Sequence, residues 1–274
     1  MAEEFTNRNS STESSRPLVV EKGRFHAYFI YDVADTIDLG KLSSDQNIAY
    51  EKAQIDLRQP ASPSYIKFEV PPLVVKAAER EIDGHKAELR LKFYDYGILS
   101  IRISFEFAGA LSEFSDFTKK LRSSEQLWHC AAKLLDDGLK QISTCLKKPH
   151  KPLLEDYFVF EVNEFKNELN SQDLLNDFRQ ELSCLLLAES RKLSPFEESD
   201  SLKVSYSYFD SDLLLIHWDS AFVYDSREGA EAVESILEFA NTQLVELRTY
   251  DERLDAELDE IYKWDVTRAQ AHWL

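Results

Sequence analysis

The residues with the clearest capacity for chemistry lie together in "YFDSDLLLIHWDS" (Tyr208–Ser220). Asp210 and Asp212 offer carboxylate oxygens. His217 and Asp219 follow with an imidazole and a further carboxylate. Such a set can bind a divalent metal and activate water, as in hydrolases and nucleases. Asp is also common in tight turns, so we favour turn and surface roles and keep a metal-dependent hydrolase or nuclease as the alternative.

Other catalytic signatures are weak. His129 and Cys130 suggest a thiol nucleophile beside its base, but adjacent residues of a helix do not face one another, which favours a structural cysteine. The sequence contains no G-x-G-x-x-G, P-loop, H-E-x-x-H or G-x-S-x-G motif. With seven glycines in the chain, a backbone cradle for phosphate is not expected. We therefore predict no cofactor and no metal, favour a non-catalytic protein, and leave enzymatic activity open.

Composition restricts the classes of partner and compartment. The formal net charge is -18, from 50 acidic and 32 basic residues, which argues against binding to nucleic acid or to anionic lipid. Cys130, Cys145 and Cys184 are isolated and odd in number, which favours a reduced compartment over a disulfide framework. The sequence shows no signal peptide and no apolar run long enough to cross a bilayer. These features predict a cytoplasmic protein, with association at a membrane kept open in case the chain is a fragment.

Hydrophobic spacing then divides the chain into two series of elements that could position these residues. The first series begins with a strand at 24–33 and a strand at 64–75 that a proline pair interrupts. A hairpin at 87–107 follows, with its turn at Asp95-Tyr96-Gly97. Helical spacing from Ser112 to Lys147 predicts one long helix or two shorter ones.

The second series repeats this order. We expect a strand at 156–165, and a helix at 171–194 capped by Ser171 or Asp173. A second hairpin at 202–225 turns at Asp210-Ser211-Asp212, and a helical pattern runs from about Arg227 almost to the end of the chain.

The two series indicate an internal repeat. "AYFIYDV" and "DYFVFEV" open the two halves, and "FYDYGILSI" and "YFDSDLLLI" occupy equivalent hairpins. We therefore predict an α+β fold with a disordered tail at 1–22, a first lobe at 23–148, a linker at 149–155 and a second lobe at 156–274. The alternative is chance similarity, because aromatic residues favour strands in general.

The C-terminal helix carries a heptad-like series of apolar residues. A helix from Glu228 to Asp265 would be about 57 Å long, longer than a compact domain is wide. Its apolar residues recur at steps of three and four, and Asp251 occupies one position of the series. We predict interaction roles for Leu237, Leu244, Leu247, Leu254, Leu258 and Ile261. We favour a helix that projects from the lobes, and the alternative is a core helix that lies across both.

Two stretches are similar to known families. "LLLAESRKLSPFEE" (Leu185–Glu198) resembles a helix end in the YagE family, which includes proteins required for meiotic nuclear division. The present chain has "AES" where that family has "AQS", and places a hairpin after the segment. "ILEFANTQLVELRTYDERLDAELDEIYKW" (Ile236–Trp264) resembles helices that precede membrane-proximal or coiled-coil segments in bacterial proteins. The resemblance implies scaffolding or tethering, with no catalytic residues to carry over.

These features together predict a non-catalytic scaffolding or tethering protein. Its partner would be another protein or a second copy of the chain, bound through the apolar residues of the C-terminal helix. Acidic side chains beside those residues would select the partner by charge. We expect truncation after Arg248 to abolish the interaction while the lobes remain folded.

Overall fold

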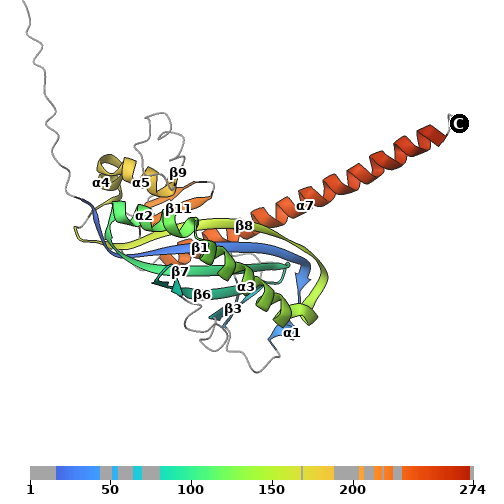
Figure 1. The fold of residues 1–274 in the computed structure, drawn as a ribbon, viewed down its shortest axis with the longest axis horizontal. Coiled ribbons are helices and arrows are strands. Elements are labelled where there is room, and N and C mark those ends of the chain that lie inside the picture. The colour runs from blue at the N-terminus through green and yellow to red at the C-terminus, as the bar shows by residue number, and fades with distance from the viewer. Residues whose placement is uncertain are drawn as a thin grey trace, which may run out of the picture.

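The fold is mixed α+β, with one large sheet and a long C-terminal helix, as expected (Figure 1). The computed structural model describes residues 17–43, 51–54, 64–69, 81–167, 169–187, 204–206, 213–217, 219–224 and 230–271. The sheet has nine strands in the order β2-β3-β6-β7-β1-β8-β11-β10-β9. Its strands are β1 (Val19–Ile37), β2 (Glu51–Gln54), β3 (Ser64–Glu69), β6 (Glu88–Tyr94), β7 (Ile98–Ala110), β8 (Leu146–Phe165), β9 (Val204–Tyr206), β10 (Leu213–Ile216) and β11 (Ser220–Tyr224).

Short elements and helices surround this sheet. A separate ribbon consists of β4 (Glu81–Ile82) and β5 (His85–Lys86). The helices are α1 (Leu39–Leu42), α2 (Leu111–Arg122), α3 (Glu125–Ile142), the 3-10 turn η2 (Ser143–Cys145), α4 (Ser171–Asp177), α5 (Arg179–Leu186) and α7 (Ala230–Ala271). No helix of the described residues is long and apolar enough to span a membrane.

The two longest strands, β1 and β8, pair antiparallel in the middle of the sheet. Residues Phe25–Ala34 of β1 and Tyr157–Val162 of β8 are buried on both faces. Successive residues of a strand point to opposite faces, so each strand contributes one set of side chains to each layer. On β1, Phe25 and Phe29 point to the face covered by α2 to α5, and His26 and Tyr28 point to the face covered by α7. The sheet therefore separates two different interiors.

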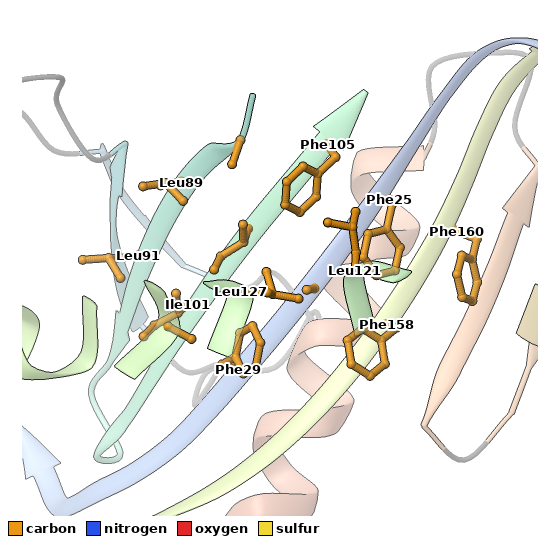
Figure 2. Close-up of a cluster of buried hydrophobic side chains, with 14 of the residues drawn as sticks. Phe25, Phe29, Leu89, Leu91, Ile101, Phe105, Leu121, Leu127, Phe158 and Phe160 are labelled. Carbon is orange, nitrogen blue, oxygen red and sulfur yellow. The ribbon is translucent and has the colours of Figure 1, made fainter. Parts of the chain in front are cut away.

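The first interior is apolar and rich in aromatic side chains (Figure 2). The Phe25 ring stacks on Phe158 at 5.9 Å and on Phe160 at 5.6 Å between centroids. Leucines of α2 and α3 close this layer, among them Leu121 and Leu127 (Figure 2). Burial of this surface is the main stabilising contribution to the body of the protein.

Local residues explain where the helices begin and end. α2 and α3 are two helices because Ser124 caps α3, and its hydroxyl accepts a hydrogen bond from Leu127 N. α4 is capped by Asn170, in place of the expected Ser171 or Asp173, and Asp173 completes a capping box. The helix expected at 171–194 is divided at Phe178, and residues 188–194 lie outside the described part.

The hairpin of β6 and β7 is confirmed, and its turn requires glycine. Gly97 has a φ of +93°, and a Cβ there would lie 1.7 Å from the carbonyl oxygen of Ala34. The turn packs this closely because Val33 N donates a hydrogen bond to Gly97 O at 3.0 Å. The second hairpin is confirmed in its strands β9 and β10, whereas Asp210 and Asp212 lie outside the described residues.

Two expected boundaries are wrong. The predicted linker at 149–155 lies within β8, where the prolines are tolerated because Pro149 falls at a register irregularity opposite Ala34. Residues 19–22 of the tail predicted for 1–22 belong to β1, and residues 1–16 lie outside the described part of the chain. The strands of the two expected lobes belong to one continuous sheet.

The two halves nevertheless share a strand order. From the centre outward, the first half runs β1-β7-β6-β3 and the second β8-β11-β10-β9. The direction differs, because β1 pairs antiparallel with β7 and β8 pairs parallel with β11. The helices that follow, α2 and α7, pack on opposite faces. The order of the strands therefore agrees between the two halves, but their direction does not. An internal repeat stays a prediction.

Candidate functional site

A buried polar cluster lies between α7 and the second face of the sheet. Strands β1, β7 and β8 bring His26, Arg102 and Glu161 to this face by their alternation, and all three are buried. Glu234, near the start of α7, reaches the same point from the helix. Four elements thus place two carboxylates, an imidazole and a guanidinium in one interior.

His26 is the centre of the cluster. Its Nε2 lies 2.8 Å from Glu161 Oε2 and 2.6 Å from Glu234 Oε1. Its Nδ1 lies 2.7 Å from the hydroxyl of Ser104, the residue opposite it on β7. A carboxylate oxygen only accepts hydrogen bonds, so Nε2 carries a proton when it bonds to these two oxygens.

The outer oxygens of both carboxylates are also held. Asn163 Nδ2 donates to Glu161 Oε1 at 2.6 Å, and Arg102 Nη1 donates to Glu234 Oε2 at 2.7 Å. The Tyr28 hydroxyl donates to the same Glu234 oxygen at 3.4 Å. These contacts fix the orientation of each carboxylate toward His26.

Burial and charge act against each other at these groups. Burial raises the pKa of Glu234, but the charge and hydrogen bond of His26 and then the charge of Arg102 outweigh it and hold the pKa well below its ordinary value. Burial, and then the charge of Glu234, raise the pKa of the Tyr28 hydroxyl. Glu234 is therefore ionised and Tyr28 neutral at ordinary pH.

Further polar contacts continue along the docked part of α7 at intervals of four residues. Glu238 forms an ion pair with Lys92 of β6, and both side chains are buried. The Thr242 hydroxyl lies 2.6 Å from the Tyr96 hydroxyl in the β6–β7 turn. Because residues four apart share one face of a helix, this row faces the sheet and fixes the register of α7 on it.

Two ion pairs mark the place where α7 leaves the sheet. Arg248 bonds to Glu155 of β8, and Arg253 Nη1 lies 2.9 Å from Asp35 Oδ1 of β1. Hydrogen bonds from Lys148 and then Arg253 lower the pKa of Asp35. From Asp251 to Lys263 nearly every side chain of α7 is exposed, and the helix extends away from the body (Figure 1).

The outer side of α7 carries exposed leucines and an isoleucine. We define the projecting stripe as five residues, with their exposed fractions: Leu244 (38%), Leu247 (65%), Leu254 (55%), Leu258 (41%) and Ile261 (57%). These are five of the six residues predicted for interaction. Leu237, the sixth, is an exception, because it is 6% exposed and packs against the sheet.

The predicted metal-binding segment is only partly described. His217 Nδ1 lies 2.7 Å from Asp219 Oδ1, so these two residues do meet. Asp219 also binds Arg122 Nη2 at 2.7 Å and accepts from the Ser220 hydroxyl at 3.1 Å, which ties α2 to the β10–β11 turn. Charged and hydrogen-bonding partners thus hold Asp219 in a structural contact. The hydrolase alternative also needs Asp210 and Asp212, and it stays a prediction.

The buried cluster of His26, Arg102, Glu161 and Glu234 was not predicted from the sequence. Its signal was the alternation in "RFHAYF" and "LSIRIS", where a His, an Arg and a Ser occupy every second position of strands that are otherwise apolar. Alternation of this kind normally indicates a face toward solvent. Only the position of α7 turns that face into an interior.

The comparisons with known proteins concern the sheet and the helices on its first face. The family model described as uncharacterized protein MJ0711, N-terminal domain, matches residues 22–231. The chain belongs to this family. His26, Arg102 and Glu161 lie within the matched residues, and Glu234 lies three residues beyond them. No curated protein and no solved structure matches the chain, and no relation to the YagE family is shown.

Proposed function

We propose that this protein is a non-catalytic scaffold that pairs with a second copy of itself through the projecting stripe of α7. The observation that carries the proposal is the exposure of five large apolar side chains on one side of a helix that extends beyond its own body. A helix with an apolar side and no surface to cover it gains stability by pairing with another helix.

The stripe has the spacing of a two-helix seam. Leu244, Leu247, Asp251, Leu254, Leu258 and Ile261 alternate steps of three and four residues. In a parallel pair, Asp251 would face Asp251 of the second copy across the seam, and two carboxylates at one point repel each other.

An antiparallel pair avoids this repulsion. If Leu247 packs against Leu258 of the second copy, the same register brings Leu244 against Ile261 and Asp251 against Leu254. It also brings Arg248 beside Asp255 of the second copy, twice by symmetry, which gives two pairs of opposite charges along one edge of the seam. The charges on this helix therefore favour the antiparallel arrangement of two copies.

Light scattering on the full chain tests the pairing. We expect a dimer that dissociates on dilution, and a monomer for Leu258→Ser with the same melting temperature as the wild type. As the matched control, Glu257→Ser on the same turn should remain a dimer. A wild-type chain that is monomeric at every concentration would overturn the proposal, and so would a dimer that Leu258→Ser leaves intact.

Cysteine cross-linking tests the direction. A chain carrying both Leu247→Cys and Leu258→Cys should form disulfides between position 247 of one copy and 258 of the other. Leu254→Cys should not link to itself, because it faces its own equivalent only in a parallel pair. Mass spectrometry of the linked peptides separates the two arrangements.

A further inference from the structure

We propose that His26, Glu161 and Glu234 form a binding site for a divalent transition-metal ion, which fastens α7 to the sheet. The site is independent of the projecting stripe and lies at the other end of the helix. Its ligands would be Nε2 of His26 and one oxygen from each carboxylate. These three atoms lie within 4.8 Å of one another.

The donor set fits a transition ion. One imidazole nitrogen and two carboxylate oxygens suit Zn²⁺, Fe²⁺ or Mn²⁺. Mg²⁺ fits poorly, because it prefers six oxygens and keeps several waters, and the His26 and Glu234 side chains are almost completely buried. We therefore expect selectivity for the transition ion.

Each ligand is also oriented by a further group, which is usual around bound metals. Ser104 holds Nδ1 of His26 and leaves Nε2 directed at the carboxylates. Asn163 holds the outer oxygen of Glu161, and Arg102 that of Glu234. Nε2 of His26 and one oxygen of each carboxylate thus converge on one point. Nδ1 of His26 and the other oxygen of each carboxylate are hydrogen-bonded away from that point.

The charge at this point calls for a cation. With a neutral imidazole, the two carboxylates and Arg102 leave one negative charge uncompensated in a buried space. The neighbouring Glu238 is balanced by Lys92 and adds no net charge. The missing positive charge can come from a second proton on the His26 ring, so that both nitrogens carry one, or from a metal ion bound to Nε2.

The distances around Nε2 indicate how a metal ion would replace the proton on this nitrogen. Nε2 lies 2.8 and 2.6 Å from the carboxylate oxygens, which is the spacing of hydrogen bonds through a proton. A tetrahedral ion with bonds of about 2.1 Å separates its ligand atoms by about 3.4 Å. A metal would therefore displace the proton and move the two carboxylates outward by about 0.7 Å.

Titration of the wild-type full chain with Zn²⁺ and with Co²⁺ tests the site. We expect one equivalent bound per chain, a higher melting temperature, and slower hydrogen exchange in the first turns of α7, because the metal joins that helix to β1 and β8. Bound Co²⁺ should give visible absorption without the ultraviolet band of a cobalt–thiolate bond. That band would show binding by cysteines and would overturn the proposal.

Variants assign the ligands. Glu234→Gln keeps the size of the side chain and removes its charge, and we expect it to weaken Zn²⁺ binding at least tenfold. The matched control is His217→Asn, which removes an imidazole that also contacts a carboxylate and should bind Zn²⁺ as the wild type does. Equal binding by Glu234→Gln and the wild type would overturn the assignment. If that variant does not fold, the wild-type titration decides, because a chain that binds no Zn²⁺ excludes the site.

Discussion

At the scale of single residues, Glu234 has the most consequences for this protein. It is the one carboxylate of the buried cluster supplied by α7, and it contacts His26 and Arg102. A buried ion pair adds little net stability, but removing one partner leaves the other charged and without compensation. Removal of the Glu234 carboxylate should therefore destabilise the protein, although the intact ion pair adds little stability of its own.

Glu234→Gln should lower the free energy of unfolding by about 3 kcal/mol, because it leaves Arg102 with a neutral partner in a buried site. Urea denaturation measures this change. Glu252→Gln, at an exposed position of the same helix, is the control and should change the free energy by less than about 0.5 kcal/mol. Equal losses in the two variants would contradict a specific role for the cluster.

The pH dependence of stability follows from the same carboxylate. The pKa of Glu234 is lower in the folded chain than its ordinary value of 4.5, so the unfolded chain binds the proton more tightly. Its contribution is therefore present above about pH 4.5 and is lost as the pH falls below that value. We expect the melting temperature of the wild type to fall more steeply than that of Glu234→Gln between neutral pH and pH 3. Parallel curves would contradict this prediction.

At the scale of elements, α7 joins two roles in one continuous helix. Its inner side covers the second face of the sheet with Glu234, Leu237, Glu238 and Val245, and its outer side carries the projecting stripe from Leu244 to Ile261. Asp251 lies within that stripe, between Leu247 and Leu254, and interrupts the seam with a charge. A charge at a seam position costs stability in the pair and limits its affinity.

Asp251→Leu should therefore strengthen self-association, because it fills the gap in the seam with an apolar side chain. We expect the dissociation constant to fall at least tenfold in sedimentation equilibrium, which corresponds to about 1.4 kcal/mol. Asp259→Leu, on the other side of the helix, is the control for added hydrophobicity. An equal gain in both variants would indicate unspecific association.

At the scale of the whole molecule, the body and the projecting end of α7 form separate structural units. The hydrogen bonds and ion pairs that the structure shows between α7 and the sheet reach as far as the contact of Arg253 with Asp35. Beyond it, α7 carries the exposed side chains of Leu254, Leu258 and Ile261. Folding of the body and pairing of two copies should therefore be separable.

Truncation after Arg253 should produce a monomer that melts at nearly the temperature of the full chain. This cut keeps the Arg253 contact, whereas a cut after Arg248 also removes the buried Thr249. Light scattering and calorimetry on the two chains measure the two properties. A truncated chain that unfolds would show that the projecting end stabilises the body, contrary to this division.

Local sequence patterns predicted most of the helices and strands. Long-range contacts determined how the strands pair and where α7 lies on the sheet. The turn at Gly97, the strands around Phe25 and Phe158, and the length of α7 follow from spacing and from the positions of glycine and proline. The pairing of β1 with β8 joins residues far apart in sequence, and no local pattern specifies it. Glu234 looks like part of an exposed helix surface until α7 is placed on the sheet.

The docked segment of α7 is held to the sheet at both of its ends, so the rest of the helix follows the orientation of this segment. Glu234 holds one end to β1 and β7, and Arg253 holds the other to β1. From that second point to Ala271 the helix runs about 27 Å at 1.5 Å per residue. A tilt of about 10° about that point would swing its tip by about 5 Å. Because the segment from Glu234 to Arg253 is about as long, a shift at the buried imidazole would reach the far end at about its own size.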